Sequence, residues 1–260
     1  MYISQIVILS AIVGVVTAGL TIRFDRFFIM LLLLFLAGTT IKNAVDIFLV
    51  VIFLGALTIL LKNKKSLKKI PRENRVKFLT LVPLLAGIFS FLGSWLFFSS
   101  SSRALIIAFG ILTILYGLRM IFVHFGEHEK NFTEAKPIYS KICSLSGPVV
   151  SGFFIGFIGT SLKALKIPFG VKLGKMNLPQ VYLGNVITSA YASLFAILWR
   201  ILFFNLNNIS FLLYGVVIWG TIHAISDITV PVFPEKWKKV FQIIIGAILL
   251  VAAMKVFLLH

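Results

Sequence analysis

The clearest chemical signal in this sequence is a cluster of hydroxyl and lysine side chains at the end of a long uncharged segment. No charged residue occurs among the 21 positions from Ile142 to Leu162, and the chain then continues through Lys163 and Lys166. Thr160 and Ser161 directly precede these lysines. A charged ligand that enters an apolar medium needs donors to replace its hydration, and hydroxyl and ammonium groups are such donors. This spacing predicts a binding site for a small anion.

The composition places this cluster in a membrane protein. Of the 260 residues, 59% are hydrophobic and 13% are charged, whereas roughly a quarter of the residues of a soluble domain are charged. Helices of about 20 apolar residues cross a bilayer, and none of the apolar runs alternates as a membrane β-strand does. The uncharged windows are 1–22, 78–102, 142–162, 176–199 and 201–222, and shorter apolar runs are 27–41, 47–61, 104–118 and 240–254. We therefore predict an all-α polytopic membrane protein.

Basic residues predict how the chain is oriented. The segment from Lys62 to Lys77 holds eight Lys or Arg against the single acid Glu73, and the positive-inside rule places it in the cytoplasm. The internal loops of the resulting topology carry fourteen Lys or Arg, and the external turns carry two, Arg103 and Arg200. We interpret 62–77 as a topology signal that contacts anionic lipid, because no aromatic residues interleave its charges as nucleic-acid binding would favour.

The two halves of the chain resemble each other. This resemblance predicts a first membrane repeat at 1–125, a cytoplasmic linker at 126–141 and a second repeat at 142–260. Residues of the same kind recur 133 to 136 positions apart, in the pairs Gly87 and Gly220, Arg103 and Lys236, Gly110 and Gly246, and Arg119 and Lys255. The loop at 62–77 is expected inside and its counterpart at 200–208 outside, which indicates an inverted repeat. An inverted repeat needs an odd number of membrane crossings in each half. We therefore predict that the first apolar pieces of each half form a broken or re-entrant helix.

In this repeat, an offset of 137 residues pairs Gly19 with Gly156 and Arg26 with Lys163. Inverted-repeat transporters bind their substrates near the midplane, where the repeats meet, so Arg26 and Lys163 are the first candidates for anion binding. The alternative is that Arg26 lies in a surface turn and that the lysines extend to the headgroups. The full set expected to contact the substrate is Arg26, Lys163, Lys166, Thr160, Ser161, Gly19, Gly156, Gly159, Asn43 and Asn185.

Three residues are candidates for a coupled proton. His223 and Asp227 stand at positions i and i+4, on one face of a helix, and Asp46 is the third candidate. The alternative is that the acids only pair with neighbouring basic groups. His223 and Asp227 are too few for a metal site, and Cys143 is the single cysteine, so we expect neither a metal nor a cofactor.

The order of glycines, prolines and helices resembles the TauE/SafE sulfite exporter family. The matching pieces are SGFFIGFIGTSLKALKIPFG, NLPQVYLGNVITSAYASLFAIL, IIIGAILLVAAMKVF, VPLLAGIFSFLGSWL and FGILTILYGLRM. The resemblance implies a secondary transporter that exports sulfite, or an organosulfonate such as sulfoacetate, across the plasma membrane. Such export would proceed by alternating access, with a coupled proton as an option.

An intramembrane enzyme that acts on a lipid or phosphate substrate is the alternative. The sequence contains no H-E-x-x-H, no phosphate-binding Gly loop ending in Lys-Ser/Thr and no G-x-S-x-G. Its eight acids are scattered along the chain. We therefore expect a protein that is not an enzyme, whose partners are a small anion and membrane lipid, without nucleic acid.

Overall fold

The computed structural model describes residues 3–20, 28–63, 80–122, 137–163, 166–167, 178–203, 210–227 and 234–258. No strand occurs among these residues, and five of their helices are long and apolar enough to cross a membrane. These five are α3 (Ile41–Lys62), α6 (Leu81–Ser99), α7 (Ser102–Phe122), α10 (Leu178–Phe203) and α12 (Glu235–Leu258). The others are α1 (Ile3–Leu20), α2 (Phe28–Phe35), α8 (Pro137–Ile158) and α11 (Ser210–Asp227). The predicted all-α polytopic fold is confirmed.

Local sequence signals set where two of these helices begin. The N–H of Asn43 donates to Oγ1 of Thr40 at 3.3 Å, so Thr40 caps α3. The N–H of Ala104 donates to Oγ of Ser101 at 3.2 Å, so Ser101 caps α7 in the same way. The chain between α6 and α7 therefore forms a short turn directly before Arg103.

Apolar side chains cover the outer faces of the helices as well as their interior. Large exposed examples are Trp95, Phe122, Leu202, Leu213 and Val251. Such surfaces are stable against acyl chains and unstable in water, because apolar area exposed to water costs free energy. Together with the five long apolar helices, they indicate a multi-pass membrane protein.

The chain divides into two compact units, and each takes helices from both halves of the sequence. Unit 1 consists of Met1–Phe48, Ser100–Gly126 and Ser210–His260, and unit 2 consists of Leu49–Ser99 and Glu127–Ile209. The first part of α3 therefore belongs to unit 1 and the remainder to unit 2. The predicted repeats at 1–125 and 142–260 concern a duplication in the sequence, and they stay a prediction.

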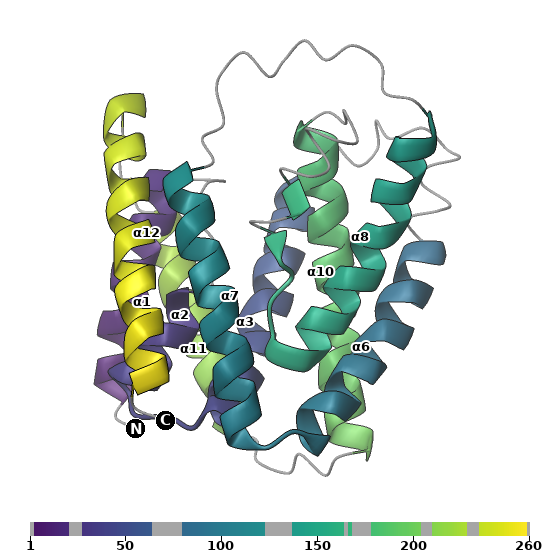
Figure 1. Ribbon diagram of the computed structural model, residues 1–260, viewed down its shortest axis with the longest axis horizontal. Helices are drawn as coiled ribbons and strands as arrows, with labels where there is room; N and C mark the ends of the chain where they lie inside the picture. Colours follow the sequence, from purple (N-terminus) through teal and green to yellow (C-terminus); the bar gives the residue numbers. More distant parts are fainter. Residues whose placement is uncertain are drawn as a thin grey trace. The chain divides into compact units, whose positions relative to one another are not determined.

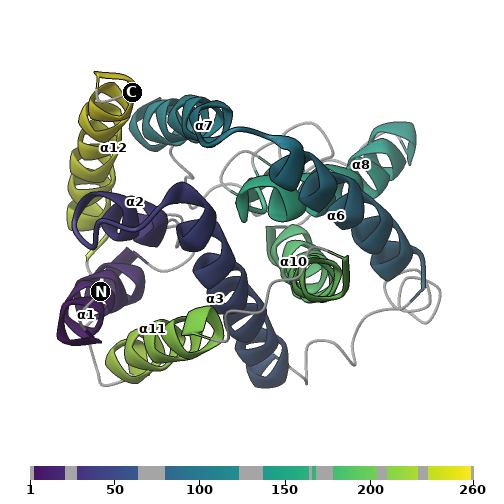
Figure 2. The same ribbon diagram turned by 90° about the horizontal axis from the view of Figure 1, so that it is seen from below.

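In unit 1, α1 packs against α11 (Figure 2) and against α2. The contact of α1 with α11 is close at Gly14, where an added Cβ would lie 3.1 Å from Cβ of Ile225.

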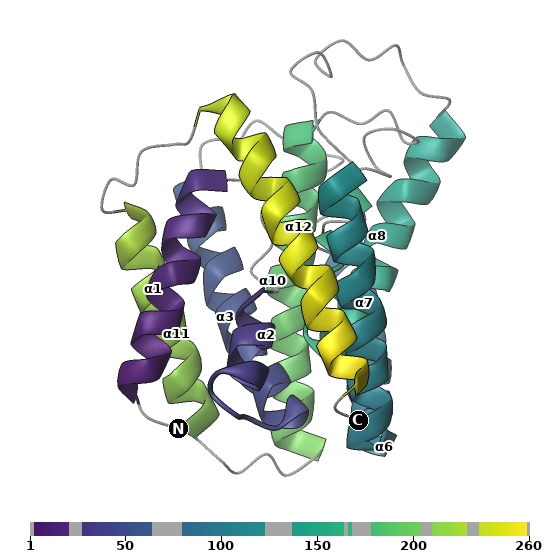
Figure 3. The same ribbon diagram turned by 60° about the vertical axis from the view of Figure 1, so that its left-hand side comes forward.

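The second packed pair of unit 1 is α7 and α12, which lie side by side (Figure 3). Their closest approach is at Gly117 and Gly246, since a Cβ added to Gly117 would lie 3.0 Å from the carbonyl oxygen of Gly246. Nε2 of Gln242 donates to the carbonyl oxygen of Met120 at 3.0 Å. Because residue numbers rise along α7 as they fall along α12, the two helices are antiparallel.

In unit 2, α6, α8 and α10 pack against one another (Figure 1). Gly152 of α8 lies against the backbone of Ala86, and Gly156 lies against the backbone of Ser90, so α6 and α8 run in the same direction. A Cβ added to Gly93 would collide with the backbone of α8. Small residues at such crossings let helix backbones approach closely, so Gly93 has a packing role.

Candidate anion site at the broken end of α8

The helix α8 ends at a glycine in the left-handed conformation. Gly159 has a φ of 70°, which an L-residue adopts only at a cost and which glycine adopts readily. The N–H of Gly159 donates to the carbonyl oxygen of Ile155 at 3.0 Å, and the N–H of Thr160 donates to that of Phe154 at 3.3 Å. These bonds close the last turn of α8 and reverse the direction of the chain.

After this reversal the chain runs back alongside α8. Oγ of Ser151 donates to the carbonyl oxygen of Ser161 at 3.1 Å. Nζ of Lys166 donates to the carbonyl oxygen of Gly147 at 3.4 Å, so the later residue lies against the earlier part of the helix. The second half of the sequence thus opens with a broken element that doubles back, as the sequence predicts.

The segment that doubles back contains a strained residue. Leu162 has a φ of 49°, which is rare for a bulky L-residue. Its N–H donates to Oγ1 of Thr160 at 3.4 Å, which helps to hold this conformation. Strained backbone persists where the surrounding structure fixes it, and it concentrates at functional sites.

The four residues singled out by their spacing all lie on this segment. Thr160 is 1% exposed and Ser161 is 8% exposed. Lys163 and Lys166 are each half-buried. Nζ of Lys163 lies 5.1 Å from the ring centroid of Tyr182 on α10, within the range of a cation–π contact. The described contacts thus hold both ammonium groups against protein, Lys163 on α10 and Lys166 on α8.

The structure corrects the position of Arg200, which the sequence analysis placed in an external turn. The helix α10 continues to Phe203, and Arg200 is a fully buried residue of its last turns, 0% exposed. Its Nη2 donates to the carbonyl oxygen of Gly156 at 2.6 Å. Its Cζ lies 3.8 Å from the ring centroid of Phe97 on α6. The prediction failed because the apolar residues after Arg200 resemble the start of the next crossing, whereas they belong to the last turn of α10.

Arg200 lies at the level of the chain reversal. In a continuous α-helix, the carbonyl of Gly156 would accept the N–H of Thr160, but that N–H donates to Phe154 instead. Arg200 supplies a donor to the Gly156 carbonyl. Its guanidinium therefore lies beside the turn that contains Thr160.

The contact of Lys166 with α8 lies farther back along that helix. The carbonyl that Lys166 contacts, at Gly147, is nine residues before the one that Arg200 contacts, at Gly156. At 1.5 Å per residue, the two contacts are about 13.5 Å apart along α8. Lys166 and Arg200 therefore contact α8 at two separate positions.

One face of α10 carries the polar residues that lead to Arg200. Ser189, Ser193 and Arg200 follow Asn185 by four, eight and fifteen positions, which spans about 80° around a helix, and all four are buried. Oδ1 of Asn185 and Oγ of Ser189 are buried with no hydrogen-bond partner. A polar face of this kind on an apolar helix is the sequence signal that identifies Arg200 as a buried residue.

Several other predicted site residues are not brought to this segment. Arg26 lies outside the described residues, and Gly19 is a residue of α1 whose surroundings are also outside them. Asn43 is exposed in the first turn of α3, and Asp46 is buried one turn later, both in unit 1. The pairing of Arg26 with Lys163 stays a prediction.

The proposed proton relay is described only in part. His223 is half-buried and stacks on Trp219, with ring centroids 5.7 Å apart. Asp227 ends α11, and its side chain lies outside the described residues. Among the residues that the structure describes, no group of three His, Cys, Asp or Glu side chains is placed to hold a metal ion.

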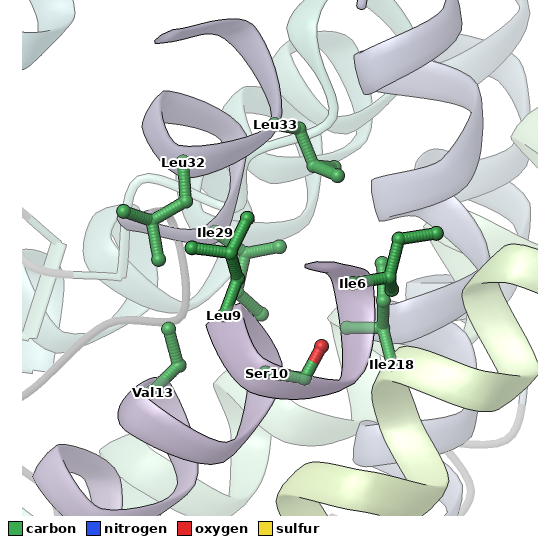
Figure 4. A pocket seen from close by; sticks show the side chains of 8 residues that line it. All are labelled: Ile6, Leu9, Ser10, Val13, Ile29, Leu32, Leu33 and Ile218. Carbon is green, nitrogen blue, oxygen red and sulfur yellow. The ribbon is translucent and has the colours of Figure 1, made fainter. Parts of the chain in front are cut away.

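A cavity in unit 1 does not fit an anion. It is lined by Ser10 and seven apolar side chains from α1, α2 and α11 (Figure 4), namely Ile6, Leu9, Val13, Ile29, Leu32, Leu33 and Ile218. The volume of this cavity is about 10 Å³, which is room for about one water molecule. A sulfonate is several heavy atoms larger.

No family model, curated protein or solved structure matches this chain. The resemblance to the TauE/SafE family therefore stays a prediction.

Proposed function

We propose that this protein is a secondary transporter that exports a small sulfur-containing anion, sulfite or an organosulfonate such as sulfoacetate, across the plasma membrane. The observation that carries the proposal is the reversal of the chain at Gly159 inside a bundle of apolar helices. It gathers Thr160, Ser161, Lys163 and Lys166 on one buried or half-buried segment.

The chemistry of this segment suits an oxyanion. Ionisable residues within a membrane bundle are costly and mark ion or substrate pathways, and broken helices are where transporters place their sites. A sulfonate oxygen accepts hydrogen bonds from hydroxyl and ammonium groups, and the segment after the reversal carries both kinds of donor. The strained Leu162 supports the proposal, because evolution retains such strain where a segment must hold one shape.

The packing of the helices supports an alternating-access mechanism. In the predicted duplication, α1 corresponds to α8 and α11 corresponds to α6. The first helix of each half packs against a helix of the other half, α1 on α11 and α8 on α6, and the two pairs are equivalent in the predicted duplication. Two repeats related by a twofold axis produce this reciprocal pairing, and rocking of such repeats exposes a site to either side in turn.

The membrane potential alone can drive the proposed export. An inside-negative potential favours the exit of an anion by about 2.3 kcal/mol per charge per 100 mV. Proton transfer through His223, Asp227 or Asp46 is therefore an additional mechanism that the energetics do not require.

Uptake into proteoliposomes tests the proposed function. We expect saturable uptake of labelled sulfite and sulfoacetate into vesicles that contain the purified full chain, faster when a potassium diffusion potential makes the lumen positive. Taurine, which has no net charge, measures charge selectivity, and sulfate, which carries the same charge as sulfoacetate at neutral pH, measures selectivity among dianions. An imposed pH gradient measures proton coupling. Uptake no greater than in protein-free liposomes, for every anion and gradient, would contradict the proposal.

A further inference from the structure

One face of α12 is not covered by the other described parts of the chain. Only 33% of its apolar span is buried, compared with 39–56% in the other four membrane-length helices. Gln242 and Gly246 of α12 contact α7. Successive residues of a helix are about 100° apart, so Val240, Ile244 and Val251 lie on the opposite side of α12, where all three are exposed. We call these three residues the apolar column.

A cluster of lysines lies at the start of this face. Lys236, Lys238 and Lys239 are among the first five residues of α12, and Lys236 and Lys239 are exposed. Glu235 is the only acid among these five residues, so their net charge is +2, three lysines less one carboxylate. Basic side chains at this end oppose the helix dipole, so they do not stabilise α12 by themselves. An anionic partner outside the chain would compensate this charge.

The dimensions of this face fit one leaflet of a bilayer. Trp237, beside the lysines, is exposed, and tryptophan is enriched at the level of the lipid headgroups. Val240 and Val251 are eleven positions apart, which is about 16.5 Å along a helix, and half of the hydrocarbon core is about 15 Å thick. An acyl chain whose headgroup lies at the lysines therefore reaches the end of the apolar column.

The charge of the cluster selects the kind of lipid. The predicted topology places this end of α12 in the cytoplasm. The cytoplasmic leaflet carries anionic lipids, and basic clusters beside a transmembrane helix attract their headgroups. A zwitterionic headgroup offers no net charge to the lysines, so an anionic phospholipid is the complementary partner.

We propose that an anionic phospholipid binds this face, with its phosphate at Lys236 and Lys239 and an acyl chain along the apolar column. The two ammonium groups donate charge-assisted hydrogen bonds to the phosphate oxygens. This lipid site is separate from the proposed function, because none of its residues belongs to the segment that is proposed to bind the transported anion.

Quenching of a probe on the apolar column tests the proposal. The full chain carries Val240→Cys in a Cys143→Ser background, is labelled with a fluorophore and is reconstituted in phosphatidylcholine vesicles. Increasing shares of spin-labelled phosphatidylglycerol or spin-labelled phosphatidylcholine are added, and the two quenching curves give a relative association constant. We expect phosphatidylglycerol to be favoured roughly 30-fold, which corresponds to about 1 kcal/mol for each of the two lysines.

Lys236→Gln combined with Lys239→Gln should lower this preference about tenfold or more. Arginine at both positions keeps the charge and should keep the preference. Lys255→Gln is the matched control and should also keep it, because Lys255 is exposed at the other end of α12, with Nζ 5.2 Å from the ring centroid of Phe35. A probe at Leu213, which is exposed on a helix without Lys or Arg, should show no preference.

An equal preference in the wild type and in the double glutamine variant would overturn the assignment. Displacement of phosphatidylglycerol by glycerol 3-phosphate would overturn it too, because the lysines would then bind a free phosphate without an acyl chain. If a second copy of the chain covers this face instead, neither lipid quenches the probe at position 240, and the lipid site is wrong.

Discussion

Replacing Lys166 by glutamine is expected to raise the apparent KM for sulfoacetate uptake about tenfold or more. The ammonium group of Lys166 is half-buried and contacts the carbonyl of Gly147 at 3.4 Å, a long hydrogen bond that an arriving anion can displace. A hydrogen bond to a charged group contributes about 1.5–3 kcal/mol, and 1.4 kcal/mol corresponds to a tenfold change in affinity. Initial rates of uptake into proteoliposomes over a range of sulfoacetate concentrations measure the effect.

Lys236→Gln is the control for this prediction. Lys236 is exposed near the start of α12 and belongs to unit 1, so its removal changes the net charge by the same amount at a residue outside the segment that follows α8. Its KM should equal that of the wild type at physiological salt, where exposed charges are screened over about 8 Å. Equal KM values for Lys166→Gln, Lys236→Gln and the wild type would remove Lys166 from the site.

Replacing Gly159 by alanine is expected to lower the maximal rate of uptake about tenfold or more and to destabilise the protein. Gly159 has a φ of 70°, and an L-residue in the left-handed region costs about 1–2 kcal/mol. The chain can relieve this strain by moving the reversal, and any such move displaces Thr160 and Ser161 from the end of α8. Uptake assays and thermal unfolding of the same preparation measure the two effects.

Two further variants isolate the backbone effect at Gly159. Asparagine enters the left-handed region more readily than alanine, so Gly159→Asn should retain more uptake than Gly159→Ala. Gly220→Ala adds a methyl group that, among the described residues beyond its own helix turn, would meet no atom within 4 Å, so it should leave uptake unchanged. If alanine and asparagine at 159 transport equally well, the conformation of this residue does not position the site.

Much of the fold follows from the sequence because one physical constraint dominates it. A membrane bundle needs long apolar helices, and uncharged windows such as 78–102 and 142–162 show where α6 and α8 lie. The break after α8 was predictable from Gly159 and the lysines that follow it. The helix ends were less predictable, because the apolar run from 201 to 222 contains both the last residues of α10 and most of α11.

The contacts of the candidate site were harder to predict because they join residues far apart in the sequence. Arg200 follows Gly156 by 44 positions, and nothing in the local sequence shows that the last turns of α10 lie against α8. The predicted register also aligns Gly19 with Gly156. This register does not include a second reversal, at the end of α2, that resembles the one at Gly159. There Gly38 has a φ of 61°, and the N–H of Thr39 donates to the carbonyl of Leu33 at 3.1 Å.

The central claim is that a small sulfonate binds at the broken end of α8, and protection of a cysteine at Ser161 tests it most directly. Ser161→Cys is made in a Cys143→Ser background, with Ser210→Cys, at the exposed start of α11, as the control. The rate of modification by a negatively charged methanethiosulfonate is measured with and without sulfoacetate, since sulfite itself would destroy the reagent. We predict that sulfoacetate slows modification at position 161 severalfold and leaves position 210 unchanged. Modification of position 161 at the same rate with and without sulfoacetate would contradict the account.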